Sequence, residues 1–313
     1  MTTTHFLRDD DLGTAEQAAV LHTAAALKAG TVAPKPLHDA AVAIIFDKPT
    51  LRTQASFTAG IASLGGYPMM VDGQLAQIGV RESIADVARV LGRMTVAIVW
   101  RTFAQSRLEE MATHAGVPVI NALTDLLHPC QVLADLLTIA EHRGGLRSEG
   151  PALQDRSLAY IGDGANNMAH SYLLGGARAG LEVRIACPPQ YAPEPEILRT
   201  AQSIAAHTGA RISITDDVSQ AAEGVDAVAT DTWVSMGQET EQAQRLATLE
   251  PFRVDTAVMA RTNDAIFLHC LPAQRGHEVT PDVIDGPSSV VWDEAENRLH
   301  VQKAVLNHLV GQR

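Results

Sequence analysis

The chain has 313 residues, of which 46% are hydrophobic and 19% are charged, a composition typical of soluble globular proteins. This length exceeds what one hydrophobic core usually supports, so we expect two domains of roughly 150 residues each. The formal net charge of −12 argues against nucleic acid or an anionic membrane as a partner, because both are bound through clustered Lys and Arg.

The sequence also indicates a compartment. No apolar run approaches the roughly 20 residues that span a bilayer, and the first residues, Met1–His5, lack the apolar segment of a signal peptide. Three widely spaced cysteines suit a reducing environment better than a disulfide framework. They are Cys130, Cys187 and Cys270. We therefore expect a cytoplasmic protein.

In the first half of the chain, short apolar runs alternate with segments that are apolar at every third or fourth position. The short runs predict strands and the periodic segments predict helices. The predicted strands are Ala41–Phe46, Pro68–Val71, Thr95–Trp100 and Val117–Asn121, and the predicted helices are Arg52–Leu64, Ser83–Arg93, Gln105–Ala115 and Cys130–His142. A glycine-rich polar stretch, Arg143–Pro151, then predicts a connection between domains.

The second half repeats this alternation. Its predicted strands are Ser157–Ile161, Glu182–Ala186, Arg211–Thr215, Asp226–Thr230 and Ala265–His269, and its predicted helices are Asn167–Ala179, Glu194–Thr208, Asp217–Glu223 and about Glu294–Val310. Alternating strands and helices indicate parallel sheets covered on both faces. We therefore predict an α/β fold of two doubly wound domains, residues 1–143 and 151–293, with a C-terminal helix, 294–313, that packs back on the first domain.

An anion site is predicted where the strand 41–46 gives way to a helix. Thr50, Arg52 and Thr53 lie at this junction. Backbone N–H groups at a helix N-terminus lack partners and the helix dipole is positive there, so a phosphate is favoured. The guanidinium adds a bidentate fork and the hydroxyls add donors. Taken alone, the same residues also fit a Thr N-cap followed by a surface Arg.

Further polar residues follow other predicted strands at their carboxyl ends, where ligands bind in such folds. Arg101 would add a second cation, although it could equally pair with a carboxylate. His128 and Gln131 flank Pro129, which favours the first turn of a helix. An imidazole and an amide at this place could hydrogen-bond a carbonyl oxygen and stabilise a developing oxyanion. A purely structural His is the alternative.

The second half contains groups suited to an amino acid. The amides of Asn166 and Asn167 could hold a carboxylate or an α-amino group, and Asp231 could hold an ammonium group. Ser235 and the Met236 backbone could close over a ligand, and the charged stretch that follows, as far as Arg245, predicts a mobile lid; a plain surface loop is the alternative.

Neither a nicotinamide cofactor nor a metal is expected. The segment Gly162–His170 lacks the third glycine of a dinucleotide loop, and no acidic residue ends the next strand, so no nicotinamide cofactor is predicted. No spaced partners complete a zinc set with His269 and Cys270, so no metal is predicted.

Taken together, these segments resemble the aspartate/ornithine transcarbamoylase family over nearly the whole chain, and most closely its ornithine branch. The motifs that carry the resemblance are Phe46-Asp47-Lys48-x-x-x-Arg52-Thr53, Gln77-Ile78-Gly79, Trp100-Arg101-Thr102, His128-Pro129-Cys130-Gln131, Asp163–Ser171, Asp231-x-x-x-Ser235-Met236-Gly237, His269-Cys270-Leu271-Pro272 and Glu294-x-Glu296-Asn297-Arg298.

The resemblance implies an enzyme of arginine biosynthesis that acts as a homotrimer or a multiple of trimers. It would transfer the carbamoyl group of carbamoyl phosphate to the side-chain amine of L-ornithine, without a cofactor or metal. The implied carbamoyl phosphate site is Thr50, Leu51, Arg52, Thr53, Gln77, Arg101, His128, Gln131, Cys270, Leu271 and Arg298, with Gln77 reaching into a neighbouring subunit. The implied ornithine site is Asn167, Asp231, Ser235 and Met236. The implied catalytic residues are Arg52, Arg101, His128, Asp231, Cys270 and Arg298.

The phosphate motif is where the chain departs from this family. Thr50 stands where Ser is usual, and Gln54 stands where Arg is usual. Gln54 removes a positive charge from the start of the helix, so we expect weaker binding of carbamoyl phosphate. Two alternatives therefore remain. One is a paralogue that carbamoylates another amine, such as diaminopropionate or a lysine-like acceptor. The other is a catalytically weak regulatory homologue.

Overall fold

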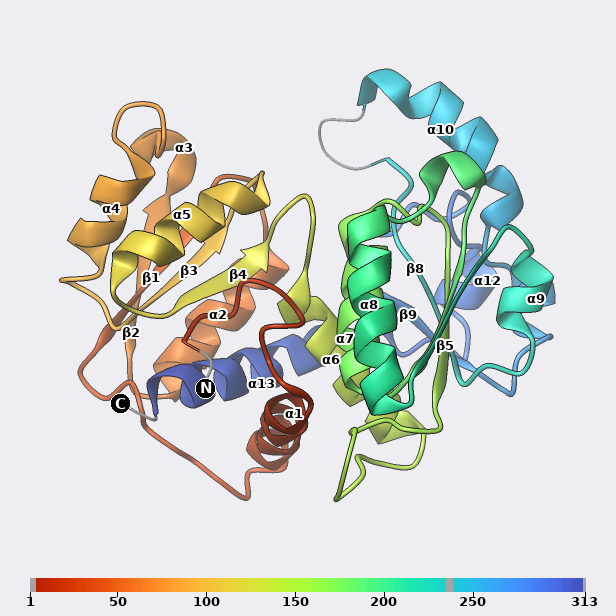
Figure 1. The fold of residues 1–313 in the computed structure, drawn as a ribbon, viewed down its shortest axis with the longest axis horizontal. Coiled ribbons are helices and arrows are strands. Elements are labelled where there is room, and N and C mark those ends of the chain that lie inside the picture. Colours follow the sequence, from red (N-terminus) through yellow and green to blue (C-terminus); the bar gives the residue numbers. More distant parts are fainter. Residues whose placement is uncertain (1–3, 235–238, 312–313) are drawn as a thin grey trace. The chain divides into compact units, whose positions relative to one another are not determined.

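The computed structural model describes residues 4–234 and 239–311. Contacts between residues divide the chain into two compact units. The first unit comprises Met1–Ala134 and Glu296–Arg313, and the second comprises Asp135–Ala295. Each unit contains one sheet with helices against it, and Figure 1 follows the chain through both. The two parallel sheets flanked by helices confirm the predicted fold class.

The chain passes between the units inside two helices, α6 (Pro129–His142) and α13 (Val291–Val310). Helix α13 begins at Val291, three residues before its predicted start at Glu294, and Val291 is fully buried. The predicted domains, 1–143 and 151–293, remain a prediction, because a division by contacts does not define which parts fold independently.

The sheet of the first unit has four parallel strands in the order β2-β1-β3-β4. Its central strands are apolar on both faces, as in the buried run of β1, Ala-Val-Ala-Ile-Ile-Phe. The strands are β1 (Ala41–Phe46), β2 (Tyr67–Asp72), β3 (Ala97–Arg101) and β4 (Val119–Leu123). The helices are α1 (Thr14–Lys28), α2 (Arg52–Ser63), α3 (Gly73–Ala76), α4 (Ile84–Leu91) and α5 (Gln105–Ala115), with α13 from Glu296 onward.

One face of this sheet is covered by α4 and α5 and the other by α1, α2 and α13 (Figure 1). On the first face, Ile45 and Trp100 of the sheet pack in one cluster with Ile84, Leu108 and Met111 of the two helices. This packing brings the carboxyl ends of β1, β3 and β4 to one edge of the unit, where the residues after each strand lie close together.

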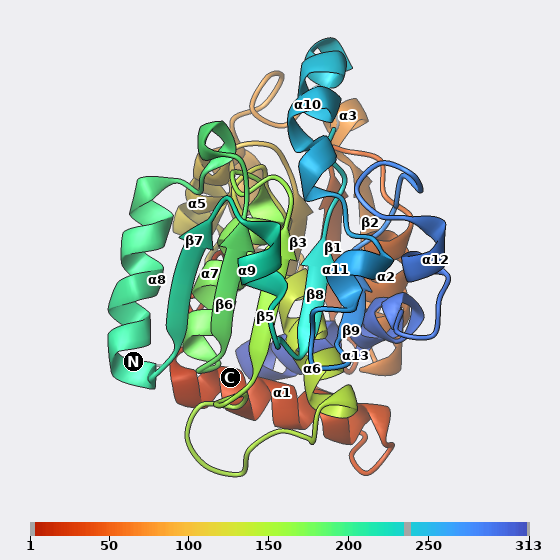
Figure 2. The ribbon, with the colours of Figure 1, turned by 90° about the vertical axis from the view of Figure 1, so that its right-hand side faces the viewer.

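The sheet of the second unit has five parallel strands in the order β7-β6-β5-β8-β9. Figure 2 shows these strands side by side, with α9 and α11 in front of them. The strands are β5 (Ser157–Ile161), β6 (Glu182–Ala186), β7 (Arg211–Thr215), β8 (Ala227–Thr230) and β9 (Ile266–His269). The helices are α7 (Asn167–Arg178), α8 (Pro195–Thr208), α9 (Val218–Ala222), α10 (Gln242–Leu249), α11 (Thr256–Met259) and α12 (Pro281–Ile284), and three short 3-10 helices are η1 (Pro189–Tyr191), η2 (Glu239–Glu241) and η3 (Glu250–Phe252).

Within residues 4–234 and 239–311, no helix is both long enough and apolar enough to cross a membrane.

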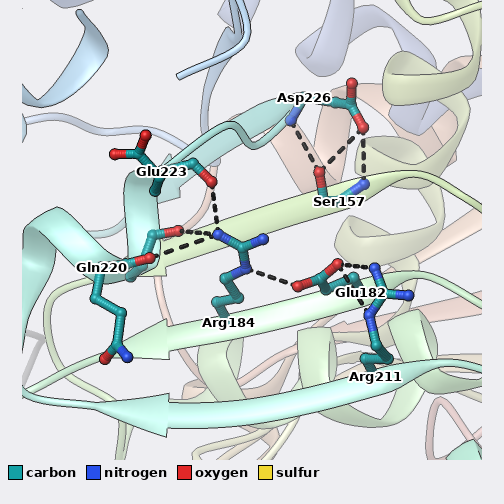
Figure 3. Close-up of polar contacts among 8 residues, drawn as sticks. Ser157, Glu182, Arg184, Arg211, Gln220, Glu223 and Asp226 are labelled. Atoms are coloured by element: carbon teal, nitrogen blue, oxygen red, sulfur yellow. Dashed lines mark hydrogen bonds and ion pairs between the residues drawn. The ribbon is translucent and has the colours of Figure 1, made fainter. Parts of the chain in front are cut away.

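A polar network joins the neighbouring strands β6 and β7 of the second unit (Figure 3). Glu182 of β6 accepts from Arg184 Nε at 2.8 Å and from Arg211 Nε of β7 at 3.1 Å. Arg184 Nη1 also donates to the carbonyl of Glu223 at 2.7 Å, just after α9. Burial acts to raise the pKa of Glu182, but the bonds from Arg211 and Arg184 outweigh it and hold that pKa below its usual value.

We expect Glu182→Gln to reduce the free energy of unfolding at pH 7 by less than about 1 kcal/mol, since the ion pairs are partly exposed. A carboxyl with a lowered folded pKa stabilises the protein above its unfolded pKa, and that contribution is lost as the pH falls through the folded pKa. Urea unfolding should therefore separate variant and wild type at pH 7, and the separation should disappear as the pH falls through the lowered folded pKa of Glu182. Glu223→Gln is the control, because its carboxylate stands outside the network in Figure 3. A difference that persists at low pH would contradict the assignment.

Candidate active site

The predicted anion-binding residues converge at one edge of the first unit. Phe46 pairs in register with Arg101, so the ends of β1 and β3 are adjacent. Arg101 Nη1 lies 3.5 Å from Thr50 Oγ1 in the loop that follows β1. Arg52 is the first residue of α2, and its N-cap is Leu51, which has no capping side chain. The alternative of a Thr N-cap is therefore wrong, and the first turn of α2 has no side-chain cap.

Arg298 ties three helices together at this edge. It lies on α13 and is only 3% exposed. Its Nη2 donates to Thr53 Oγ1 of α2 at 2.6 Å, and its Nη1 donates to Gln131 Oε1 of α6 at 2.9 Å. A planar guanidinium can reach two acceptors at fixed separation, which a lysine cannot do. Residues that are far apart in the sequence are thus held in one place.

His128 lies directly before α6 and is 3% exposed. Burial, followed by the charges of Arg298, Arg101 and Arg52, lowers the pKa of His128 well below its ordinary value. The imidazole is therefore neutral at physiological pH, with one N–H donor and one acceptor nitrogen. Three guanidinium groups that act on one buried histidine create a positive field suited to a phosphate.

The second unit gathers acidic and thiol groups at the ends of β8 and β9. Cys270 Sγ donates to Asp231 Oδ1 at 3.2 Å. Burial raises the pKa of Asp231, and burial together with Asp231 and Glu294 raises the pKa of Cys270 well above its usual value. Cys270 is therefore a neutral thiol that donates to a carboxylate. A buried carboxylate such as Asp231 is a natural partner for an ammonium or amine group.

The turn after β9 is held by its own histidine. His269 Nδ1 accepts from the Leu271 N–H at 2.9 Å, and His269 Nε2 lies 3.2 Å from Glu278 Oε1. Glu294 accepts from the His269 N–H at 2.7 Å. These bonds hold Leu271 in the left-handed region, with φ of 58°. Cys270 and Leu271 belong to the second unit, so their contact with carbamoyl phosphate remains a prediction.

The structure does bring three groups of metal-binding type together, which the sequence spacing does not indicate. Side-chain atoms of Asp231, His269 and Cys270 lie within 4.8 Å of one another. Both ring nitrogens of His269 already face protein groups, however, and the Cys270 thiol has a raised pKa. A metal would need that thiol deprotonated. The geometry therefore fits a hydrogen-bonded cluster, and the absence of a metal remains a prediction.

Four predicted residues remain: Asn167, Ser235, Met236 and Gln77. Asn167 begins α7, beside Asn166, whose side chain caps that helix by accepting from the Ala169 N–H at 2.9 Å. Ser235 and Met236 lie outside the described residues. Gln77 is exposed in the first unit, at the end of α3.

The prediction of a mobile lid is wrong for residues 239–245, which are helical. Residues 239–245 belong to η2 and α10, and Arg245 is only 4% exposed. Arg245 pairs with buried Asp163, donates to the Trp233 carbonyl at 2.6 Å, and lies over the Tyr191 ring at 4.7 Å. The helix was not predicted because it is apolar on only one side and acidic residues lie around Arg245.

A surface hollow in the second unit, beside α9, contains none of the predicted site residues. Its lining includes Arg184, Thr215 and Arg261.

Comparison with known proteins identifies the two halves separately. A family model described as "Aspartate/ornithine carbamoyltransferase, carbamoyl-P binding domain" matches residues 4–141. A second, described as "Aspartate/ornithine carbamoyltransferase, Asp/Orn binding domain", matches residues 154–309. An ornithine carbamoyltransferase from Clavibacter sepedonicus is 56% identical over 312 residues, which cover 99% of both chains.

Solved structures agree over the full chain. The ornithine carbamoyltransferase from Pyrococcus furiosus is 40% identical with a TM-score of 0.93, and the alignment covers 100% of this chain and 98% of that one. The anabolic ornithine carbamoyltransferase from Campylobacter jejuni is 39% identical with a TM-score of 0.91, over 100% of both chains.

The protonated thiol of Cys270 predicts slow alkylation. We expect iodoacetamide at pH 7.5 to modify Cys270 far more slowly than free cysteine, because the thiolate is the reacting form. Asp231→Asn removes the neighbouring charge, so it should lower the pKa of Cys270 and accelerate its alkylation. Peptide mass spectrometry gives the rate at each cysteine, with Cys130, whose pKa burial raises to about 12, as the internal control. An unchanged Cys270 rate in Asp231→Asn would refute the coupling.

Proposed function

Because the chain belongs to the aspartate/ornithine carbamoyltransferase family, we propose that it transfers the carbamoyl group of carbamoyl phosphate to the side-chain amine of L-ornithine. The products are L-citrulline and phosphate. The observation that supports this most strongly is the buried bridge from Arg298 to Thr53 and Gln131, beside neutral His128. It gathers cations, hydroxyls and an uncharged imidazole at the N-termini of α2 and α6.

The first unit supplies the groups that carbamoyl phosphate needs. The uncapped first turn of α2 and the guanidinium groups of Arg52, Arg101 and Arg298 would bind the phosphoryl oxygens. His128 is neutral and keeps an N–H that can donate to the carbamoyl oxygen. That bond strengthens as the oxygen becomes an oxyanion, so it favours the transition state over the substrate. The same cations stabilise the phosphate as it leaves.

The second unit supplies the groups that an amino-acid acceptor needs. Asp231 would orient the side-chain nitrogen of ornithine, and Asn167 with Ser235 and Met236 would bind its backbone groups. The free amine has a pKa near that of lysine, about 10.4, and only its neutral form attacks the carbamoyl carbon. Cys270 remains a thiol, so the substrate amine and not this sulfur serves as the nucleophile. Positioning and charge then carry the reaction.

We assign carbamoyl phosphate binding to residues 1–143 with 294–313, and ornithine binding to residues 151–293. The pathway would be arginine biosynthesis in the cytoplasm. Three free cysteines support a reducing compartment, and the anabolic enzyme from Campylobacter jejuni supports the pathway.

A homotrimer, or a multiple of trimers, is the proposed assembly, with Gln77 entering a neighbour's site. Its support is a set of exposed apolar side chains on the first unit. Some of them are in the residue 73–83 segment that contains Gln77, and one is in the loop after β1, residues 47–51, which we call the phosphate loop. Exposed groups of this kind mark interfaces between proteins. They are Leu51, Leu75 and Val80, which are 78%, 80% and 84% exposed, with Tyr67 and Met70 of β2.

Arg52→Ala tests the phosphate assignment. Loss of one charge-stabilising donor typically lowers kcat by about 10²–10³-fold, so citrulline formation should fall by at least that factor in kcat/KM for carbamoyl phosphate. Arg89→Ala is the control, since that surface arginine bonds to Asp86 of α4 and lies 3.4 Å from His114 Nδ1 of α5. Near-normal kinetics in Arg52→Ala would exclude the role.

The assembly has its own test. We expect wild type to elute as a trimer or a multiple of trimers by size-exclusion chromatography with light scattering. The double change Leu75→Asp and Val80→Asp places two charges on the exposed apolar surface and should give monomers. Val32→Asp, on another exposed apolar residue, should leave the mass unchanged. A monomeric wild type, or a double variant of unchanged mass, would contradict the assembly.

A further inference from the structure

The loop that carries Gln77, residues 73–83, has an unusual backbone. Gln77 ends α3 in the left-handed region, with φ of 49° and ψ of 46°, and Gly79 follows with φ of 80°. A side-chain-bearing residue in this region is strained, and it stays there only when its surroundings hold it. Gln77 is itself exposed. Its backbone is bonded within the loop, since its N–H donates to the Gly73 carbonyl at 3.0 Å and its carbonyl accepts from the N–H groups of Val80 and Arg81 at 2.9 Å. A side chain from outside the loop holds the residue that follows it.

Arg107 of α5 provides one such hold. Its Nη2 donates to the carbonyl of Ile78, the residue after Gln77, at 2.7 Å. Its Nε donates to Thr102 Oγ1 at 3.0 Å, and its guanidinium lies over the Trp100 ring at 5.2 Å. The planar guanidinium of Arg107 thus contacts Trp100 and Thr102 on one side and bonds to the residue 73–83 loop on the other.

Asp47 connects these contacts of Arg107 to the phosphate loop. It follows β1 directly and is 6% exposed. Its Oδ2 accepts from Thr102 Oγ1 at 2.6 Å and lies 3.5 Å from Arg107 Nη2. The Thr102 hydroxyl therefore accepts from Arg107 and donates to Asp47. A single chain of polar contacts therefore runs from the Ile78 carbonyl through Arg107 and Thr102 to Asp47, which begins the phosphate loop.

The start of the loop packs on the same carboxylate. A Cβ added at Gly73 would lie 2.0 Å from Asp47 Oδ1 and 2.9 Å from the Phe46 carbonyl, so a side chain does not fit there. Gln74 Nε2 donates to the Asp47 carbonyl at 3.3 Å. Asp47 therefore contacts the beginning of the loop, and Arg107 contacts its middle.

We propose that Arg107 and Asp47 are positioning residues that set the Gln77 loop relative to the phosphate loop. This rests on the proposed function, in which Gln77 completes a neighbouring subunit's carbamoyl phosphate site. Arg107 then acts on the neighbour's substrate through the backbone of Ile78. Its removal should impair carbamoyl phosphate binding in the adjacent subunit and leave ornithine binding unaffected.

The first test is steady-state kinetics of Arg107→Met, which keeps an apolar stem against Trp100 and removes the guanidinium. We expect KM for carbamoyl phosphate to rise on the order of tenfold, consistent with loss of a charge-assisted hydrogen bond, while KM for ornithine stays within about twofold. Arg107→Lys, which cannot form the planar fork, should recover the lower KM only in part. Arg89→Met is the matched control on α4. Equal changes in both KM values would overturn the proposal.

The second test is subunit mixing. Arg52→Ala subunits keep an intact Gln77 loop, and Arg107→Met subunits keep an intact phosphate loop. In mixed trimers, a site can combine Arg52 of one subunit with a well-placed Gln77 loop of the other. We expect the remixed sample to exceed the mean activity of the two parents at low carbamoyl phosphate concentration. Activity equal to that mean would overturn an action across subunits.

A third readout does not depend on turnover. Amide hydrogen exchange of residues 78–82 should accelerate in Arg107→Met, while exchange in α2 stays as in wild type. Unchanged exchange in the loop would overturn the proposal even if the enzyme made citrulline. Accelerated exchange in a protein that makes no citrulline would support the positioning role and refute the proposed function instead.

Discussion

The first unit depends on one buried cation. Arg298 is 3% exposed and bridges Thr53 and Gln131, so it fixes the start of α2 against α6 and α13. A buried guanidinium is costly unless its donors are used, and the bonds to Thr53 and Gln131 use two of them. Burial lowers the pKa of His128, and the charges of Arg298, Arg101 and Arg52 lower it further. An incoming phosphate would relieve the mutual repulsion of these cations, so the arrangement that keeps the histidine neutral also suits the anion binding that we propose.

The second unit has the opposite electrostatics. Buried acidic groups, Asp231, Glu278 and Glu294, surround the turn after β9, and Cys270 donates to one of them. Burial, followed by the charges of Asp231 and Glu294, raises the pKa of the thiol. The acidic groups create a field that favours an amino group. One unit is thus built for the anionic donor and the other for the amine acceptor. Neither unit needs a protein nucleophile for the reaction that we propose.

The sequence predicted most of the fold because the buried strands are short apolar runs in a regular alternation. β1, β5, β6 and β7 have the predicted bounds. Helix α1 was not predicted, since its apolar residues lack a clear helical period. The role of Arg298 came only from the family resemblance, because Thr53 lies 245 residues away in the chain. The contacts of Arg107 with Ile78 and Thr102 could not be predicted, because no spacing rule links a helix side chain to a carbonyl 29 residues earlier.

The central claim is that this chain carbamoylates ornithine. The most direct measurement is kcat/KM for carbamoyl transfer from carbamoyl phosphate to ornithine, lysine and diaminopropionate under identical conditions. We predict that kcat/KM for ornithine exceeds that for both other amines by at least about 100-fold, because a misplaced amine loses most of the advantage of orientation. A higher kcat/KM with either alternative amine, or no citrulline formation from ornithine, would contradict it.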